Sequence, residues 1–177
     1  LEVITSLAKS VDYLILGGGI ANTVLKAMGY EIGSSLHEES MLETAKLLSE
    51  DTTNSCVIPE ILDVLVARKF SAESKAILKN IEDVSKDDLI LDIGPKTVNK
   101  YEVIIEKAAT IIWNGPVGVF EFDEFSQGTK NISNAIINSN GYSAAGGGDT
   151  IAAIDKFDAA DGISYISTGG GAFLEFI

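Results

Sequence analysis

The sequence predicts an α/β domain with a doubly wound, mostly parallel sheet and helices on both faces, the three-layer arrangement of Rossmann-like folds. Short apolar runs alternate with amphipathic segments along the whole chain, and this pattern is typical of parallel strands covered on both faces. Three of the runs also end in three consecutive glycines and lead directly into a helix-like segment, at residues 17–19, 146–148 and 169–171. The 177 residues contain no low-complexity linker, so we expect residues 1–177 to form a single domain.

The first half of the chain begins with helical patterns. Residues 1–8 are expected to be the remainder of a helix, residues 13–16 a strand, and residues 20–28 a helix that Gly29 closes. Residues 38–49 have the apolar periodicity of another helix. Two short strands are expected around Pro59, at 56–58 and 64–67.

The second half repeats the strand-and-helix pattern more clearly. A strand at 89–92 is followed by Gly94 and Pro95, and then by a helix that carries Val98, Tyr101, Ile105 and Ala108 on one face. The next strand is expected at 110–113, before a helix marked by Phe125, Ile132 and Ile136. Two further strands, at 143–145 and 163–168, lead into the last two glycine turns.

The glycine turns indicate phosphate binding. Glycine lets the backbone approach a ligand closely, and a helix N-terminus offers unpaired N–H groups with partial positive charge. Because ligands of parallel sheets bind at the carboxyl ends of the strands, all three turns are expected to border one crevice. The alternative is that they are only tight connections between strands and helices.

Composition excludes several classes of protein. The formal net charge of −13 would repel DNA or RNA, so nucleic-acid binding is not expected. No apolar run approaches the roughly 20 residues that cross a bilayer, and no secretion signal opens the chain, so membrane association is not expected either. The single cysteine, Cys56, cannot form an internal disulfide; it is expected to be buried, in a protein of the reducing cytoplasm.

The same charge balance poses a problem for a phosphate site, because no lysine or arginine lies within the glycine turns. Phosphoryl transfer normally needs cations around the phosphates. We therefore expect them to come from elsewhere, in part from a divalent metal ion. Asp149, directly after Gly148, is the best-placed carboxylate to bind that ion.

The common nucleotide motifs do not fit. The dinucleotide pattern G-x-G-x-x-G lacks its last glycine in all three turns, where Asn22, Ile151 and Leu174 stand instead. The P-loop pattern fails because Gly128-Thr129-Lys130 continues with Asn131 and is expected to lie inside a helix. His37, the only histidine, is expected to be a surface residue, and no catalytic triad or metal-ligand cluster has suitable spacing.

Four longer motifs resemble the carboxyl-terminal domain of phosphoglycerate kinases. They are Asp92-Ile93-Gly94-Pro95-Lys96-Thr97, Trp113-Asn114-Gly115-Pro116-Val117-Gly118-Val119-Phe120-Glu121, Gly146-Gly147-Gly148-Asp149-Thr150 and Ser167-Thr168-Gly169-Gly170-Gly171-Ala172-Phe173-Leu174-Glu175. They occur in the family's order, and the resemblance covers nearly the whole chain.

The resemblance implies an ATP-binding transferase of glycolysis. Members of the family transfer a phosphoryl group between 1,3-bisphosphoglycerate and ADP, giving 3-phosphoglycerate and ATP, with Mg²⁺ and two domains that close on each other. The carboxyl-terminal domain binds ADP or ATP, and the amino-terminal domain binds the phosphoglycerate. The full enzyme is expected to be a monomer.

The family's roles can be carried over to matching residues. By resemblance, the nucleoside would lie against Gly18, Gly19, Leu91, Asn114, Gly115, Pro116 and Phe120, with Glu121 bonded to the ribose. The phosphates would bind Gly147, Gly148 and Thr150, Asp149 would ligate Mg²⁺, and Gly169, Gly170 and Gly171 would face the transferred group. From the residues alone, the alternatives are that Asp149 is a helix N-cap or first-turn acid, Glu121 an ordinary exposed acid, and residues 114–116 only a turn.

The sequence also departs from the family's pattern. A lysine-bearing segment expected before Leu1, the phosphoglycerate-binding domain and the tail expected after Ile177 are not in this sequence, so we expect cut ends and a fragment that is inactive alone. Val24 stands where phenylalanine is usual, and Ile61 where a second proline often occurs. The alternative function is a stand-alone, non-catalytic nucleotide-binding module.

Overall fold

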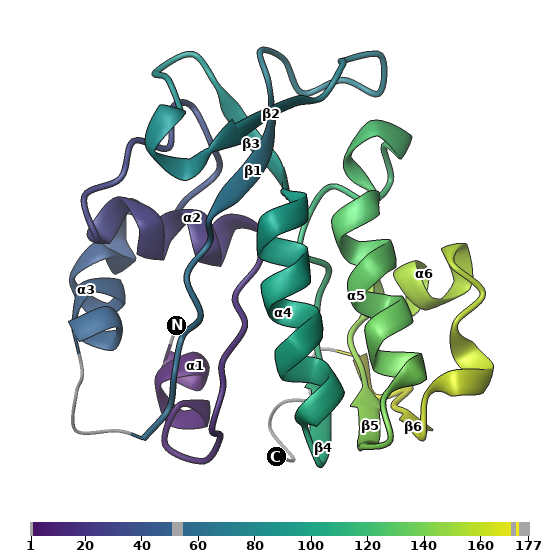
Figure 1. Cartoon of the computed structure of the whole chain (residues 1–177). Helices are drawn as coiled ribbons and strands as arrows, with labels where there is room; N and C mark the ends of the chain where they lie inside the picture. The colour runs from purple at the N-terminus through teal and green to yellow at the C-terminus, as the bar shows by residue number, and fades with distance from the viewer. Residues whose placement is uncertain (1, 51–54, 171–172, 174–177) are drawn as a thin grey trace.

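A computed structural model describes residues 2–50, 55–170 and 173. Within them the strands form two three-stranded sheets, ordered β2-β1-β3 and β4-β5-β6. Figure 1 shows the first sheet at the top of the molecule and the second at the bottom right. The strands are β1 (Asp63–Ala67), β2 (Ile77–Asn80), β3 (Leu89–Ile93), β4 (Thr110–Trp113), β5 (Tyr142–Ala145) and β6 (Tyr165–Ile166).

The lower sheet is parallel, and helices connect its strands. Trp113 at the end of β4 pairs with Ala145 at the end of β5, and β6 pairs with β5 on its other side. Helix α5 (Gln127–Asn138) joins β4 to β5, and α6 (Gly148–Lys156) joins β5 to β6. These connections confirm the predicted α/β class and place two glycine turns at the carboxyl ends of neighbouring strands.

The main core lies between this sheet and its helices. Helix α4 (Pro95–Lys107) precedes β4 and stands beside α5 in front of the strands (Figure 1). The predicted apolar faces supply most of the buried side chains, with Tyr101 of α4, Ile132 of α5 and Trp113 of β4 in one cluster. Phe125, predicted on the α5 face, instead lies in the 3-10 turn before that helix and is buried in a separate cluster. Ala108 follows the end of α4 and is partly exposed, so the buried face ends at Ile105.

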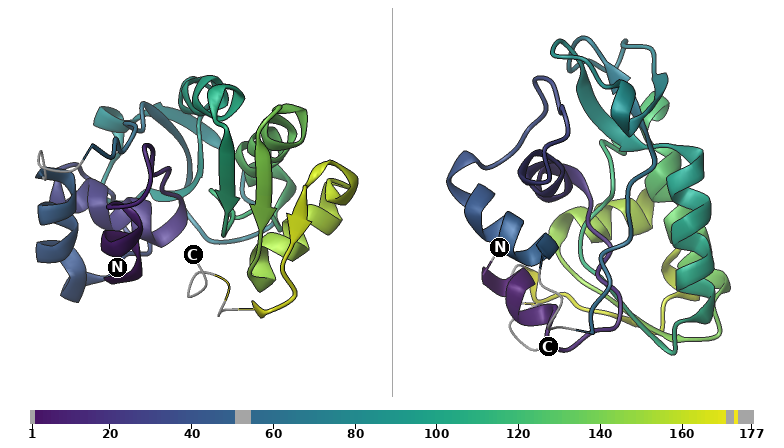
Figure 2. Two further views of the ribbon diagram at one scale, coloured as in Figure 1. Left: turned by 90° about the horizontal axis from the view of Figure 1, so that it is seen from below. Right: turned by 60° about the vertical axis from the view of Figure 1, so that its left-hand side comes forward.

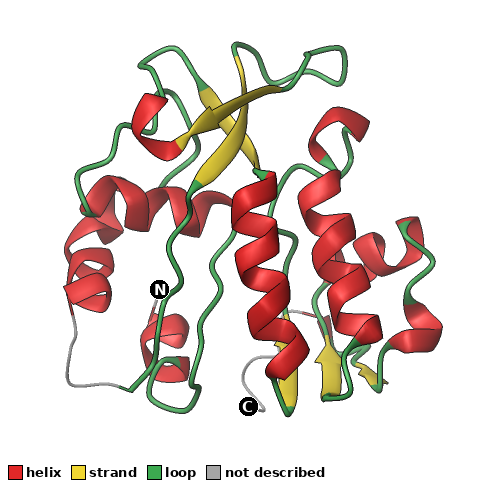
Figure 3. Cartoon of the chain, in the orientation of Figure 1, coloured by secondary structure: helices red, strands yellow, loops and turns green. Residues whose placement is uncertain are grey.

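The upper sheet differs from the expected parallel arrangement. Strands β1 and β3 coincide with the predicted runs at 64–67 and 89–92, but β1 pairs with β3 and β2 in the antiparallel sense. Strand β2 was not predicted, because Ile77 and Leu78 at this sheet edge are half-exposed and do not alternate with buried positions. Figure 3 shows this sheet joined to the rest of the molecule mainly by loops.

The first third of the chain is mostly helical. The helices are α1 (Glu2–Leu7), α2 (Gly18–Ala27) and α3 (Leu42–Glu50), with the 3-10 turn η1 (Glu39–Met41) before α3. Gly29 follows α2 with a φ of +91°, as expected for the residue that ends a helix. The three predicted helices of this region are therefore confirmed. Further 3-10 turns of the same length occur later in the chain, at η2 (Ile81–Asp83), η3 (Asp123–Phe125) and η4 (Ala160–Gly162).

The strands predicted at 13–16 and 56–58 do not form regular strands. A single parallel bridge joins Tyr13 to Val57, where the Leu14 N–H donates to the Val57 carbonyl at 3.0 Å. Both segments run as extended chain through the middle of the molecule (Figure 2, right-hand view). Their apolar character therefore reflects packing of extended chain rather than a ladder of paired strands.

An aspartate of the upper sheet binds the start of helix α4. The two carboxylate oxygens of Asp63 in β1 accept hydrogen bonds from the Lys96 and Thr97 N–H groups, at 3.1 and 2.9 Å. Gly94 makes room for this contact, because a Cβ atom there would lie 2.3 Å from the Asp63 carboxyl carbon. Asp63 thus supplies, from a distant strand, the acceptors that the first turn of α4 lacks.

Candidate nucleotide-binding site

A cleft of about 350 Å³ lies between the start of α2, strand β3 and residues 116–119. Four predicted nucleoside-binding residues line it: Gly18, Gly19, Leu91 and Pro116. Its lining is mainly apolar, with β1 and α2 contributing Val64 and Leu25. The cleft is therefore suited to a flat, mostly apolar group such as a nucleobase.

The first glycine turn forms one wall of this cleft. Gly17 is the N-cap of α2 and packs against the backbone of Val117, so closely that a Cβ atom on Gly17 would lie 2.7 Å from the Val117 Cα. The Gly18 N–H donates to the Val117 carbonyl at 3.4 Å, and Gly18 has a φ of +57°. Glycine is required here by both the close approach and the left-handed backbone.

The connection between β4 and α5 is irregular but held at several points. The Gly115 N–H donates to Thr150 Oγ1 at 2.7 Å, the Val117 N–H to Thr129 Oγ1 at 3.2 Å, and the Val119 N–H to the Leu91 carbonyl at 2.7 Å. We call residues 114–122 the connecting segment. Its N–H groups bind α6, α5 and β3 in turn, so its position relative to the cleft is fixed.

The second glycine turn begins α6. Gly147 is the N-cap, with a φ of +93°, and the next two residues, Gly148 and Asp149, are exposed. Asn114 lies against this turn, since a Cβ atom on Gly147 would be 2.9 Å from Asn114 Oδ1. Thr150 is buried, and its hydroxyl accepts the Gly115 N–H. The turn exposes the first N–H groups of a nine-residue helix next to the connecting segment.

The third glycine turn lies next to the second. Ser167, just after β6, donates its N–H to the Ala145 carbonyl at 2.8 Å, and its hydroxyl accepts the Gly169 N–H at 3.2 Å. Gly169 is exposed and Gly170 has a φ of +61°. Gly171, predicted to face the transferred group, lies outside the described residues, and so does most of the helix-like segment after it.

Phe120 and Glu121 are placed differently from each other. The Phe120 side chain is buried, with its ring 6.4 Å from that of Phe157, so it contacts the core rather than the cleft. Glu121 is exposed on the adjacent position. The exposed Glu121 side chain is therefore accessible to a ligand, whereas the buried Phe120 side chain is not. The backbone of Phe120 still belongs to the connecting segment.

Several lining residues were not predicted. The loop after α2 brings Ser35 and Leu36 to the cleft, and the loop after β1 brings Phe70, whose ring lies 5.0 Å from that of Phe122. None of them belongs to a glycine turn. Leu36 and Phe70 are large apolar residues that are largely exposed, and no local pattern in the sequence indicates that their loops reach the cleft.

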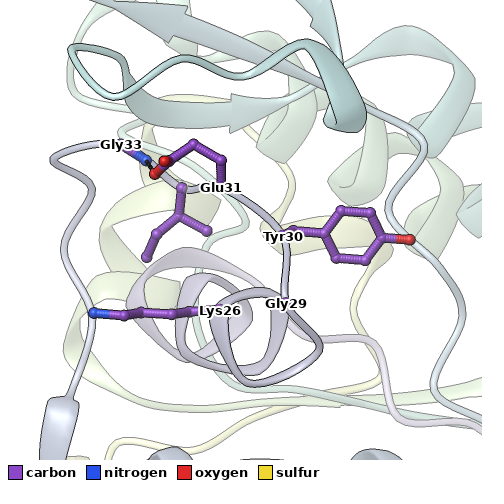
Figure 4. Close-up of a pocket in the computed structure, with 6 residues that line it drawn as sticks. Lys26, Gly29, Tyr30, Glu31 and Gly33 are labelled. Atoms are coloured by element: carbon purple, nitrogen blue, oxygen red, sulfur yellow. Dashed lines mark hydrogen bonds between the residues drawn. The ribbon is translucent and has the colours of Figure 1, made fainter.

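A second hollow, of about 320 Å³, lies at the other end of α2 (Figure 4). Its lining includes Lys26, Tyr30 and Glu31, and the Glu31 carboxylate accepts the Gly33 N–H at 2.8 Å. Lys26 turns to His37 and Glu39, at 2.8 and 2.7 Å. None of the predicted site residues lines this hollow, and its lysine already has an acidic partner.

His37 and Cys56 are both partly buried, which differs from the surface position expected for His37 and the full burial expected for Cys56. The His37 side chain is 23% exposed and belongs to the contact with Lys26 and Glu39, so it is partly buried rather than a free surface residue. Cys56 is also only partly buried. Burial, together with the nearby Asp12 carboxylate, raises the pKa of its thiol and so keeps it protonated.

The site offers one carboxylate for a metal ion. Among the described residues, no group of three or more histidine, cysteine, aspartate or glutamate side chains could hold a metal by itself. Mg²⁺ typically binds one or two carboxylates together with waters and substrate phosphates. Asp149, exposed beside the free N–H groups of α6, is the kind of donor that such a phosphate-bound ion would use.

A buried aspartate adjoins the cleft. Asp92 of β3 accepts the Gly128 N–H at the start of α5, at 2.7 Å, and the Ile93 N–H at 2.9 Å. Cβ atoms on Gly118 or Gly128 would lie 2.2 or 2.1 Å from its Oδ1 atom, so the carboxyl fits between two glycines. Burial raises the pKa of Asp92 to about 7, outweighing the two N–H donors.

Comparisons with known proteins identify the family. A sequence model described as "Phosphoglycerate kinase" matches residues 1–177, the full length of the chain. The chain belongs to the phosphoglycerate kinase family. The phosphoglycerate kinase structure from Coxiella burnetii is 48% identical, with a TM-score of 0.94 over 98% of this chain. Another, from Pyrococcus horikoshii OT3, is 32% identical, with a TM-score of 0.81 over 99%.

The chain is shorter than the solved family members that it matches. This chain spans 45% of each of those two phosphoglycerate kinase chains. No helix of the described residues is long and apolar enough to cross a membrane. The resemblance found in the sequence motifs is thus confirmed, and the matched region is less than half of either solved family member.

Proposed function

We propose that this chain is the nucleotide-binding half of a phosphoglycerate kinase, which binds ADP or ATP for phosphoryl exchange between 1,3-bisphosphoglycerate and ADP. The base would occupy the cleft beside Gly18, Gly19 and Leu91. The phosphates would bind the N-terminus of α6 at Gly147–Thr150. As a glycolytic enzyme, the whole protein would act in the cytoplasm.

One observation carries the proposal: a single short segment touches both glycine turns. Residues 114–117 contact Gly17 through Val117 and bind Thr150 through the Gly115 N–H. Pro116, between these two points, lines the cleft. A molecule with a flat apolar end and a polyphosphate end could therefore bind along this segment, with each end beside the chemistry that suits it.

The chain would contribute to the reaction by holding the nucleotide rather than by covalent chemistry. The exposed N–H groups of Gly148 and Asp149 would donate to phosphate oxygens, with the positive end of the α6 dipole behind them. The fixed connecting segment would keep the terminal phosphate of ADP in one direction for in-line attack on the acyl phosphate. Gly169 and Gly170 would allow the second substrate to approach closely, because they present no side chain.

Asp149 would hold Mg²⁺. When bound, the ion supplies positive charge to the phosphates, which the glycine turns do not provide. The carboxylate is exposed in the first turn of α6, so it is available to a phosphate-bound ion.

The remaining parts of the active site would come from a second domain that binds 3-phosphoglycerate, and we propose that this 177-residue chain is inactive by itself. Missing cationic groups comparable to an arginine finger would lower the rate by about three to five orders of magnitude. The second candidate is a non-catalytic nucleotide-binding module. It is favoured by the fact that the cleft and the α6 N-terminus are both formed within this one chain.

Calorimetric titration of the purified chain with ADP, with and without Mg²⁺, tests the proposal. We expect binding that strengthens with Mg²⁺, and none with NAD as the control ligand. Absence of ADP binding by a chain whose circular dichroism shows it to be folded would contradict the proposed function. If binding is found, mixing the chain with a separately produced amino-terminal domain of a family member distinguishes the kinase half, which should regain turnover, from a non-catalytic module.

A further inference from the structure

The C-terminal end of α6 contacts the part of the connecting segment that carries Glu121. Lys156, the last residue of the helix, donates from its ammonium group to the Phe120 carbonyl at 2.8 Å and forms an ion pair with Asp123 at 3.0 Å. The Glu121 carbonyl lies 3.5 Å from the same nitrogen. One cation thus contacts positions 120, 121 and 123, on both sides of the Glu121 side chain.

The geometry points to a role for Lys156: we propose that it is a positioning residue that sets the Glu121 carboxylate for the ribose of the bound nucleotide. The inference rests on the function proposed above, and in particular on Glu121 binding the ribose. Lys156 itself would touch no part of the ligand, since its ammonium group is already turned to the backbone of the connecting segment.

The contacts at the two ends of α6 explain why this position matters. At the N-terminal end, Thr150 accepts the Gly115 N–H, and at the C-terminal end Lys156 binds residues 120–123. The helix that would hold the phosphates is therefore attached twice to the segment that would hold the nucleoside. Because a helix rises about 1.5 Å per residue, Thr150 and Lys156 are about 9 Å apart along the helix axis. The two attachments together fix the direction of the segment as well as its position.

The other contacts of this region hold the neighbours of Glu121. The Phe122 N–H donates to the Val119 carbonyl at 3.1 Å, and the Phe122 ring lies 5.0 Å from that of Phe70. Phe120 packs against Phe157, which fixes the start of the region through side chains. The Glu121 side chain is exposed, and the atom of this residue that Lys156 contacts is the backbone carbonyl oxygen. Without the ammonium group, the Phe120 and Glu121 carbonyls would lose a shared donor, and the Glu121 backbone would be held only through the contacts of its neighbours.

The test is a double-mutant cycle on the whole 177-residue chain, with the dissociation constant for ADP in the presence of Mg²⁺ as the measurement. Lys156→Met keeps an unbranched side chain one atom shorter and removes the charge, and we expect it to weaken binding about tenfold, equivalent to about 1.4 kcal/mol. Lys156→Arg, which can make the same contacts, should restore affinity to within about threefold of the wild type. In the Glu121→Ala background, Lys156→Met should change affinity less than about twofold, because its effect runs through the side chain that Glu121→Ala removes.

Lys107→Met is the matched control. Lys107 is also the last residue of a helix, α4, so the substitution removes the same charge from the same kind of position. It should leave affinity unchanged. Equal losses in the Lys107 and Lys156 variants, or no loss in either, would overturn the inference.

The cycle also separates this inference from the proposed function. If the wild-type chain binds no ADP, the proposed function fails and this inference fails with it. If the wild type binds but Lys156→Met causes the same loss with and without Glu121, the function stands and the inference is wrong, because an additive loss indicates general destabilisation. Urea unfolding of each variant shows whether that loss follows stability.

Discussion

A single carboxyl group beside the cleft is expected to make the stability of the domain depend on pH near neutrality. The folded state raises the pKa of Asp92 to about 7, whereas an unfolded chain leaves an aspartate near about 3.9. The folded protein therefore holds this proton more tightly. By linkage, the resulting stabilisation is complete below about pH 4 and is lost as pH rises to about 7.

Asp92→Asn should remove that dependence. Relative to the wild type, the free energy of unfolding of the variant should rise by about 2–3 kcal/mol between pH 5 and pH 8, because only the wild type has to ionise a buried carboxyl. Urea unfolding at several pH values measures it. Asp161→Asn, in the exposed turn η4, serves as the control and should follow the wild-type curve. Parallel curves for all three proteins would contradict the assignment.

Asp149 is a second single residue with a testable role, but replacing it is expected to leave the stability of the domain nearly unchanged. Asp149→Ala should abolish the strengthening of ADP binding by Mg²⁺, because the phosphate-bound ion loses its protein ligand. The free energy of unfolding should change by no more than about 1 kcal/mol, since the exposed side chain contributes only its charge at the helix N-terminus. Calorimetry with and without Mg²⁺ measures the first effect, and Asp161→Ala is the control. Retained Mg²⁺ dependence would show that another group holds the ion.

At the level of elements, helix α4 depends on a side chain from another strand. Asp63→Ala would leave the Lys96 and Thr97 N–H groups without their carboxylate acceptors, next to Gly94. We expect the free energy of unfolding to fall by about 2–4 kcal/mol, combining the loss of a cap with buried unsatisfied donors. Thermal or urea unfolding checks this. A loss below about 1 kcal/mol would mean that water replaces the carboxylate.

Elements with a clear period were predictable from the sequence, and those set by distant contacts were not. Helices α2, α4 and α5 and strand β4 follow from apolar periodicity and turn residues. The antiparallel pairing of β1 and β3 could not be predicted, because a short buried strand has the same apolar pattern in either direction. The segments at 13–16 and 56–58 show the converse, since their apolar residues belong to extended chain with one bridge.

Among the residues of the candidate site, the sequence indicates most directly those at which the backbone conformation requires glycine. Gly18 has a left-handed backbone conformation that favours glycine, and it lines the cleft together with Gly19. Phe70 and Leu36 reach the same cleft from loops, and a loop's direction depends on contacts that no local pattern records. Phe120 lies within one of the four family motifs, and its side chain packs in the core, a placement that the motif alone does not indicate.

For the whole molecule, the decisive property is that the described chain forms a cleft and a helix N-terminus, but has no cation within its glycine turns. The chain alone should therefore bind a nucleotide without transferring phosphate. In a coupled assay, we expect turnover at least about a thousandfold below that of a full-length phosphoglycerate kinase. Comparable turnover would contradict the need for a second domain, and a full-length family member provides the reference.

The connecting segment also has a consequence for local motion. Its amides at Gly115, Val117 and Val119 donate to three different elements, although the segment has no regular secondary structure. These amides should exchange with deuterium as slowly as those of the buried helices, because none can open unless α6, α5 or β3 moves away. An irregular stretch of chain would then belong to the most slowly exchanging part of the protein, while the regular edge strand β2 exchanges early.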